Sequence, residues 1–454
     1  MNNKSLKFVP LIAAVALFGC SEDVQQAAKL KQAEIIGNLA DRNMKTDVAG
    51  GFHTIPIARR ELAPNIYQVT GVANTHLVKT SKGSVIFDAG LVTQAARQIK
   101  LLKEIDPGHV THVILSHSHQ DHVGGTQFWE GEGTEVVAHR EYAEEQRYLK
   151  HLEAYFWKRN RTLFPWIPEE APQMEMVAYG HVKPTLFVDE NDYKFEQGGV
   201  QFEVLSTPGA EGADNISLWL PQEKMLFTGD FFGPLFPQFP NIFTMRGEKV
   251  RKPIEYIRSL DKLLALNAEV VVPSHHDPIR GADQINAALT KMRDAVQYVH
   301  DETVAGMNAG KSVWQLMDEV QLPAHLELTQ EHGKTSWAVR SIWEYYATWF
   351  HFDSTTELYS VSPRSMYGEL AELAGVDRVL AKAQAYFEQE DYVRALHMLE
   401  YALGAEQDNQ PALELRLATL EAMLAKAITS GNSYEKDWLR SRVKITRQEL
   451  GLEE

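Results

Sequence analysis

The sequence predicts an α/β protein followed by an all-α region. Three observations lead to this prediction. Short β-rich runs alternate with helical segments over residues 51–281, strands vanish after about residue 282, and helical periodicity continues to the C-terminus. Interleaved strands and helices favour an αβ/βα sandwich, in which two mixed sheets are covered by helices. Because 454 residues are too many for one compact core, two or three domains are expected.

The strands expected in the first region are short and are bounded by Gly and Asp, as turns require. They lie at 65–69, 75–78, 84–88, 110–115, 135–138, 200–205, 217–220, 225–228 and 269–272. A helix is expected at 92–105, between the third and fourth of these strands. The segment 142–184 carries many aromatic and basic side chains. It is interpreted as an inserted helix and loop that could overhang an active site.

Long amphipathic helices are expected at 282–307 and 336–350. The aromatic residues of the second are Trp337, Trp343, Tyr345, Tyr346, Trp349 and Phe350. So many aromatic side chains are not expected to face water, so packing within the chain or a partner subunit must cover them. Helices from about residue 370 onward resemble tetratricopeptide pairs, and a plain helical bundle explains them equally well.

The charge balance excludes one class of partner. The formal net charge is −16, and no cluster of Lys and Arg stands out. Phosphate backbones need a positive footprint, so a nucleic-acid partner is not expected. An acidic protein can still bind a small anionic substrate when metal and Arg charges are concentrated in its cleft.

Residues 1–19 are expected to be an export signal. A short basic region precedes an apolar segment at 8–18, which is too short to span a bilayer as a mature helix. Cys20, the only cysteine, stands where a bacterial lipoprotein signal places its lipidated residue, and residues 20–50 are interpreted as a tether. Ser21 does not resemble the aspartate that retains lipoproteins at the inner membrane, so an outer-membrane lipoprotein facing the periplasm is expected. An uncleaved anchor, or a plain secretory signal that yields a soluble periplasmic protein, is the alternative.

A dense group of metal-binding side chains follows the strand at 110–115. His117, His119, Asp121 and His122 form an HxHxDH motif directly before two glycines. Imidazole nitrogens and carboxylate oxygens are ligands of zinc and its first-row neighbours. In an extended turn the first two histidines project the same way and can reach one metal, while the aspartate and the third histidine point toward a second.

Later strand ends can supply the remaining ligands. Asp230 follows an apolar strand and Gly229, and its two oxygens can bridge two cations. Glu211 lies in a turn after another strand, and His276 follows the strand at 269–272, with His275 beside it as a rival. Each signal is weak alone. Their occurrence together, in this order after HxHxDH, predicts a dinuclear metallohydrolase.

These motifs resemble those of the metallo-β-lactamase fold. Glu211, in Thr-Pro-Gly-x-Glu and nineteen residues before Asp230, is similar to the corresponding residue of the alkyl sulfatases of that fold. Asp230 itself departs from that family, which has a glutamate there. Further similar segments are 241–251, 274–281, 322–326 and 339–342, the last two within a region that resembles the family's dimerisation domain. The likeness covers nearly all of residues 60–430.

The resemblance implies two Zn²⁺ per subunit. The expected ligands are His117, His119 and Glu211 at one ion, Asp121, His122 and His276 at the other, and Asp230 between them. Asp121 and Arg246 are expected to be catalytic, since Arg246 matches the family's sulfate-binding arginine. Asn241 and Tyr179 are expected to contact the substrate.

The resemblance also implies an activity and an assembly. It implies a homodimer that hydrolyses alkyl sulfate esters to alcohol and inorganic sulfate, with a metallo-β-lactamase-like catalytic domain at 51–281 and a helical alkyl sulfatase dimerisation-type domain at 282–454. The metals would activate a bridging water at neutral pH. Two alternatives stay open. The substrate could be another ester, such as an aryl sulfate, phosphodiester or lactone, or the chain could be a lipoprotein scaffold with a vestigial metal site.

Overall fold

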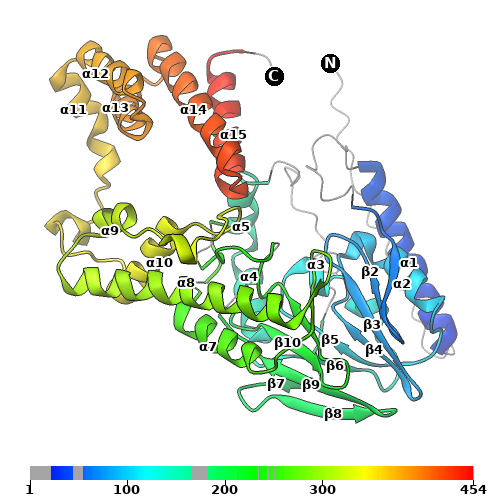
Figure 1. Cartoon of the computed structure of the whole chain (residues 1–454). Helices are drawn as coiled ribbons and strands as arrows, with labels where there is room; N and C mark the ends of the chain where they lie inside the picture. The colour runs from blue at the N-terminus through cyan, green and yellow to red at the C-terminus, as the bar shows by residue number, and fades with distance from the viewer. Residues whose placement is uncertain are drawn as a thin grey trace, which may run out of the picture.

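The computed structural model describes residues 22–43, 55–164, 182–209, 211–233, 235–242, 245–249 and 251–452. Within these residues two mixed β-sheets pack face to face, and helices cover their outer sides (Figure 1). Helices alone continue from residue 282. The predicted sandwich followed by an all-helical region is therefore confirmed.

The first sheet contains seven strands in sequence order. They are β1 (Arg59–Ala63), β2 (Ile66–Val69), β3 (Thr75–Thr80), β4 (Gly83–Phe87), β5 (Val110–Ile114), β6 (Glu135–His139) and β7 (Leu186–Val188). Strands β1 to β4 pair antiparallel, and β4 to β7 pair parallel. Helix α2 (Val92–Lys103) connects β4 to β5, because parallel neighbours need a crossover.

The second sheet has the strand order β13-β12-β11-β10-β9-β8. Its strands are β8 (Tyr193–Gln197), β9 (Val200–Ser206), β10 (Ile216–Leu220), β11 (Met225–Gly229), β12 (Val270–Pro273) and β13 (Ile279–Arg280). Only β11 and β12 pair parallel here, and helix α7 (Pro253–Leu264) connects them. Each sheet thus has a parallel pair of strands whose carboxyl ends can carry functional residues.

Apolar side chains fill the space between the sheets and cover both outer faces. Phe87 and Ile114 from the first sheet meet Phe202 and Phe227 from the second in one buried cluster. A second cluster joins the first sheet to α2 and to Ala33 of helix α1 (Glu22–Asn43). A third joins the second sheet to α7 and to the helices that follow it in sequence. This is the layered core that a sandwich requires.

Helix α1 lies within the segment expected to be a tether. It packs along α2 (Figure 1). The Lys29 ammonium donates to the Glu130 carbonyl oxygen at 2.9 Å. The signal segment and Cys20 lie outside the described residues. Among the helices that the structure describes, none is long and apolar enough to cross a membrane.

Three short helices follow the strands β5 and β6 in sequence. They are α3 (Gln120–Val123), α4 (Tyr142–His151) and α5 (Glu153–Asn160). The last two begin the segment interpreted as an insertion. Tyr179, within the same segment, lies outside the described residues.

The C-terminal helices form two groups. They are α8 (Ala282–Asn308), α9 (Val313–Glu319), α10 (Thr335–Ala347), α11 (Tyr367–Ala374), α12 (Val376–Glu388), α13 (Tyr392–Ala405), α14 (Gln410–Ser430) and α15 (Ser433–Glu449). The first three share the apolar cluster of the second sheet, so this cluster spans the expected domain boundary at 281/282. Helices α11 to α15 have smaller clusters of their own. Helices α11, α12 and α13 project away from the sandwich, whereas the start of α15 returns to the body of the molecule (Figure 1).

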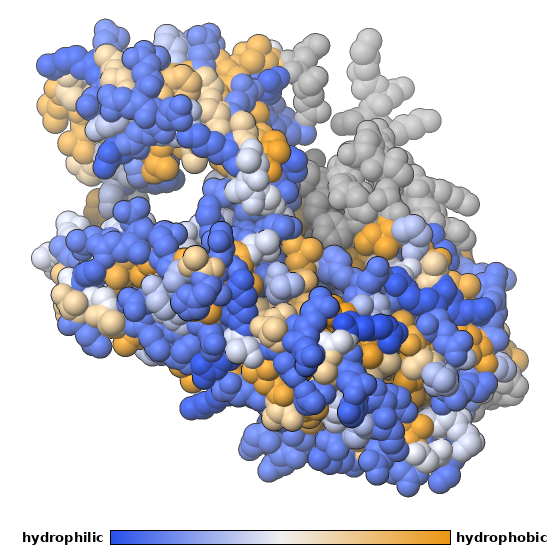
Figure 2. Space-filling view, viewed as in Figure 1, coloured by the Kyte–Doolittle hydropathy of each residue, from blue (hydrophilic) through white to orange (hydrophobic). Residues whose placement is uncertain are grey.

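The aromatic helix α10 is only partly covered. Trp343 packs against the large apolar cluster, whereas Tyr345 and Tyr346 are 40% and 45% exposed, and Trp349, just after the end of α10, is 69% exposed. Phe352 and Tyr359, in the segment after α10, are 86% and 68% exposed. Hydrophilic residues dominate the face of the molecule drawn in Figure 2. These exposed aromatic side chains are therefore candidates for contact with a partner.

Candidate metal centre

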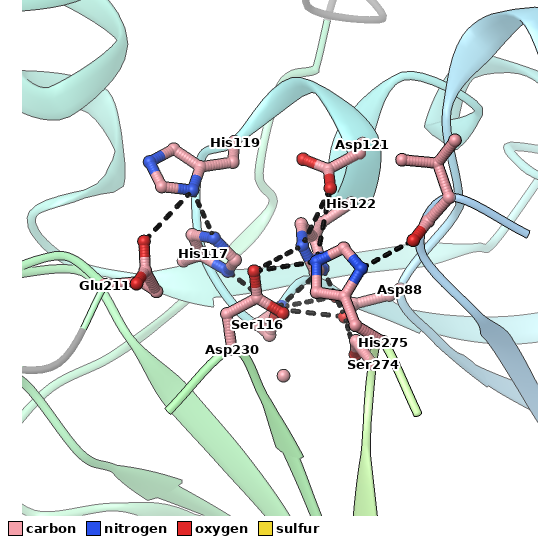
Figure 3. Close-up of polar contacts among 12 residues, drawn as sticks. Asp88, Ser116, His117, His119, Asp121, His122, Glu211, Asp230, Ser274 and His275 are labelled. Carbon is pink, nitrogen blue, oxygen red and sulfur yellow. Dashed lines mark hydrogen bonds and ion pairs between the residues drawn. The ribbon is translucent and has the colours of Figure 1, made fainter. Parts of the chain in front are cut away.

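The metal motif and the later candidate ligands meet at one edge of the sandwich. His117, His119, Asp121 and His122 lie in the turn after β5 and in α3. Asp230 directly follows β11, and His275 follows β12. Since β4 and β5 run parallel in one sheet and β11 and β12 in the other, their carboxyl ends face each other across the core (Figure 3).

Four of these side chains form what we call the histidine–aspartate group: Asp121, His122, Asp230 and His275. One nitrogen or oxygen of each lies within 4.8 Å of the others. The Nε2 atom of His275 is 2.9 Å from Oδ2 of Asp230 and 3.4 Å from Oδ2 of Asp121. The Nε2 atom of His122 is 3.2 Å and 3.5 Å from the same two oxygens. Two imidazoles and two carboxylates thus converge on one point.

The Nδ1 atoms of His122 and His275, on the other side of each ring, already make hydrogen bonds. The Nδ1 atom of His122 donates to Oδ2 of Asp88 at 2.8 Å, and Nδ1 of His275 donates to the Val72 carbonyl oxygen at 2.5 Å. A proton on Nδ1 leaves a lone pair on Nε2 of the neutral ring, and here that lone pair faces carboxylate oxygens. Such an arrangement requires either a second proton or a cation between the groups.

Burial and charge act in opposite directions on this group. Burial disfavours a charged His122, but Asp230, Asp121 and Asp88 together raise its pKa well above the usual value. Burial likewise opposes charge on His275, and Asp230 outweighs it, raising the pKa to about 9. The two imidazolium charges in turn hold the pKa of Asp230 well below its usual value despite burial. The carboxylates therefore favour positive charge at this point.

Buried atoms without partners test whether a metal fits. The Nε2 atom of His122 and the Oδ1 atom of Asp230 are buried and have no hydrogen-bond partner among the described residues, although Nε2 lies within ion-pair distance of Oδ2. Leaving such atoms unsatisfied is costly. A divalent cation accepts both kinds of ligand atom, so the residues present fit a zinc-type ion.

A second cluster adjoins the first through Asp230. His117, His119 and Asp230 also place one ligand atom each within 4.8 Å of one another. The Nε2 atom of His117 and Nδ1 of His119 are 2.7 Å apart. The nearer Glu211 oxygen lies 3.9 Å from Nδ1 of His119. Because Asp230 belongs to both clusters, it occupies the position expected of a bridging carboxylate.

Asp88 supports both clusters from behind. It directly follows β4, it is fully buried, and its backbone has a φ of 57°. It accepts hydrogen bonds from the Ser116 amide and hydroxyl at 2.8 and 2.9 Å, and from the Ser274 hydroxyl at 2.7 Å. Together with its bond to His122, these contacts fix the two loops that carry the ligands. Partners of this kind orient metal-binding imidazoles.

Beside Glu211 lies a buried cluster of four charged side chains, called here the arginine group: Glu211, Arg246, Glu248 and Arg251. Arg251 donates to both Glu211 oxygens, at 2.9 and 2.8 Å, and also contacts Glu248 at 2.9 Å. Arg246 contacts Glu248 at 3.0 Å and Glu211 at 3.2 Å. Burial opposes ionisation of Glu248, but Arg246 and His119 outweigh it and hold its pKa well below the usual value.

The C-terminal helices reach the same region. Tyr434 begins α15, is buried, and stacks near His332 and Phe164 with ring centroids 4.8 and 6.3 Å apart. The amide of Ser433 donates to the Glu331 carbonyl oxygen at 2.8 Å. Burial raises the pKa of Tyr434 to about 12, although the charge of Arg246 opposes that shift.

The structure brings together all but one of the metal ligands expected from the sequence. The exception is His276, which is exposed, and only its backbone carbonyl oxygen is held, by Asn74 at 3.3 Å. Ser274 turns toward Asp88, so the next residue, His275, turns into the cluster. The preference for His276 is therefore corrected to His275.

Among the residues expected to meet substrate, Asn241 is buried and Arg246 is partly buried near the cluster. The carbonyl oxygen of Asn241 accepts from Arg251 at 2.8 Å, and its side-chain amide has no partner among the described residues. The sequence reasoning missed Asp88, Glu248 and Arg251. Asp88 could have been found, because it ends an apolar strand as Asp230 does.

Comparisons with known proteins agree with this geometry. The model of the metallo-beta-lactamase superfamily matches residues 69–275, and that of the alkyl sulfatase dimerisation domain matches residues 313–439. Residues 69–275 are thus similar to the metallo-β-lactamase superfamily, and residues 313–439 are similar to the alkyl sulfatase dimerisation domain. The two matches together make the chain homologous to the alkylsulfatases.

Three relatives illustrate this similarity. A linear primary-alkylsulfatase of Pseudomonas sp. is 28% identical over 75% of this chain and 68% of its own length. An alkyl/aryl-sulfatase of Saccharomyces cerevisiae is 24% identical over 82% of this chain and 62% of its own. The solved structure of a stereoselective inverting sec-alkylsulfatase from Pseudomonas sp. matches with a TM-score of 0.74 and 22% identity, over 91% of this chain and 70% of that one. This last likeness extends the shared fold to the C-terminal helices.

Proposed function

We propose that this protein hydrolyses alkyl sulfate esters to an alcohol and inorganic sulfate at a centre of two divalent cations, with zinc as the expected metal. The observation that carries the proposal is the pair of ligand clusters sharing Asp230, placed beside Arg246 in a chain with an alkyl sulfatase dimerisation domain. The relatives named above support the substrate class.

The position of each residue indicates the role proposed for it. His117, His119 and Glu211 would hold one cation, and the histidine–aspartate group the other, with Asp230 shared. When bound, such cations lower the pKa of a water molecule so that it can attack at neutral pH. Arg246, whose Nε and Nη2 already contact Glu248 and Glu211, would offer its remaining N–H donors to the sulfate oxygens, and guanidinium suits that geometry better than ammonium does. The side-chain amide of Asn241, which has no partner among the described residues, can donate a further hydrogen bond.

Sulfate release from dodecyl sulfate tests this function. The purified protein is loaded with Zn²⁺, its metal content is measured, and free sulfate is followed by ion chromatography, with Asp121→Ala as the control. We expect turnover that disappears in the variant and after chelation, and that returns with added Zn²⁺. Absence of release from protein with about two metals per subunit would discard alkyl sulfates as substrates and direct the search to other esters.

We also propose that the protein acts as a homodimer. The matched dimerisation domain supports this, as do Trp349, Phe352 and Tyr359, whose rings are largely exposed. Light scattering of the purified protein would give the mass of the assembly, and a monomer at micromolar concentration would contradict the proposal.

From the N-terminal sequence we propose that the protein is an outer-membrane lipoprotein, anchored at Cys20 and facing the periplasm. Labelling with radioactive palmitate in a bacterial host, compared with a Cys20→Ala variant, would test the anchor. Label in both proteins, or in neither, would count against it.

A further inference from the structure

Glu248 lies at the contact between the metal ligands and the sulfate-binding side of the site. Its Oε1 atom is 3.3 Å from Nε2 of His119 and 3.0 Å from Nε of Arg246. Its Oε2 atom is 2.9 Å from Nη2 of Arg251 and 3.2 Å from Nη2 of Arg246. The side chain is 17% exposed, so these contacts account for most of its surroundings.

The two carboxylates and two guanidiniums of the arginine group cancel in charge. Glu211 contacts Arg251 through both oxygens and Arg246 through one, at 3.2 Å. Glu248 contacts Arg246 through both oxygens, at 3.0 and 3.2 Å, so it is the carboxylate most fully engaged with the arginine that would meet an anionic substrate. In a buried setting, where water screens little, one such charge has a large effect.

We propose that Glu248 determines the charge of the ester that the site accepts, favouring monoanions such as sulfate monoesters over dianions such as phosphate monoesters. This inference rests on the proposed function, since it assumes that Arg246 meets the anionic group. Each extra negative charge on a ligand bound to Arg246 is repelled by Glu248 across a few ångströms of protein. That repulsion corresponds to about a ten- to hundredfold difference in affinity at an effective dielectric constant near 20.

Two non-hydrolysable ligands separate charge from shape. Octanesulfonate carries one negative charge, and octylphosphonate carries two at alkaline pH, with the same alkyl chain. Their dissociation constants are measured by calorimetry on the zinc-loaded full chain at pH 9. We expect the ratio of the phosphonate constant to the sulfonate constant to fall by about tenfold or more in Glu248→Gln.

Two matched variants control for other effects. Glu248→Asp keeps the charge and should retain most of the preference for the monoanion. Glu144→Gln removes an equal charge from an exposed side chain that pairs with Lys249 and Arg147, and it should leave the ratio unchanged. An unchanged ratio in Glu248→Gln would overturn the proposal. Loss of one bound metal in Glu248→Gln would also overturn it, because His119, Glu211 and Glu248 have ligand atoms within 4.8 Å of one another.

The wild-type protein provides a test that needs no variant. As pH rises through the second ionisation of the phosphonate, its binding should weaken relative to that of the sulfonate, whose charge stays constant. Equal or stronger binding of the dianion would overturn the proposal even if Glu248→Gln fails to fold. Because binding is measured, the preference can be established even if no sulfate ester is hydrolysed, and failure of the proposed function would be seen separately.

Discussion

The histidine–aspartate group and the arginine group lie side by side and are held in different ways. In the first, each imidazole has one nitrogen fixed by Asp88 or a backbone carbonyl, and the other nitrogen points at carboxylates. In the second, the Glu211 carboxylate has both oxygens bonded to Arg251 and also faces His119, so it lies between the expected cation site and the two arginines. The first group therefore favours a cation, whereas in the second Arg246 and Arg251 supply the positive charge. We infer that the histidine–aspartate group suits a metal, that the two arginines suit an anion, and that Glu211 joins the two sides.

The largest effect is expected where the two metal clusters meet. Asp230→Asn removes the charge shared by His122 and His275, so metal content should fall below one per subunit. The value of kcat/KM should fall by about a thousandfold or more, equivalent to about 4 kcal/mol of transition-state stabilisation. Elemental analysis and the sulfate-release assay would check this, and full metal content in the variant would show that Asp230 is not a ligand.

A smaller effect is expected behind the histidine–aspartate group. Asp88→Asn keeps the shape but weakens the hold on His122 and the two serines, so metal affinity should fall about 10- to 100-fold. Competition with a fluorescent chelator would measure this. Unchanged affinity would mean that the two loops stay in place without the Asp88 charge.

Substitutions in the arginine group should change stability or substrate binding and leave metal content nearly unchanged. Arg251→Met leaves two buried carboxylates with one guanidinium, so the free energy of unfolding should fall by about 3 kcal/mol. Thermal unfolding would measure this loss.

Arg246→Lys should instead raise KM about tenfold with little loss of metal, because an ammonium cannot form paired bonds to sulfate. Steady-state kinetics would measure the change in KM. A loss of metal in Arg246→Lys would contradict the separation of the two groups.

The smallest effect on catalysis is expected far from both groups. Trp349→Ser combined with Phe352→Ser removes exposed aromatic surface, which should weaken self-association and change kcat/KM less than about twofold, as surface substitutions usually do. Analytical ultracentrifugation would detect the change in assembly. A strong loss of activity in folded monomers would show that the partner subunit supports the site.

The strands that the sequence predicted and those that it missed differ in position. Each expected strand is present, and the four that were not expected are β1, β7, β8 and β13, which form the outer edges of the two sheets. Edge strands are short and polar on the solvent side, so they lack the apolar pattern of central strands. β13, with only two residues, gives almost no sequence signal.

The part of the candidate site that lies in one short sequence motif was predictable. The part whose side chains come together only in the folded chain was harder to predict. HxHxDH supplied four candidate ligands, but the choice between His275 and His276 depends on how the chain turns after β12. Glu248 and Arg251 had no signal of their own, because their importance comes from charges that lie far apart in the sequence. Asp88 is distant in sequence from Ser274, and only the packed sheets bring them together.

The contacts at the start of α15 limit where the chain can be truncated. Tyr434 and the backbone of Ser433 are fixed against residues beside Arg246, almost at the end of the chain. Removing the last helix would uncover buried aromatic surface next to the arginine group. A shortened version consisting of the two sheets alone is therefore not a minimal enzyme, and tags or fusions are better joined after the end of α15 than at the α14–α15 turn.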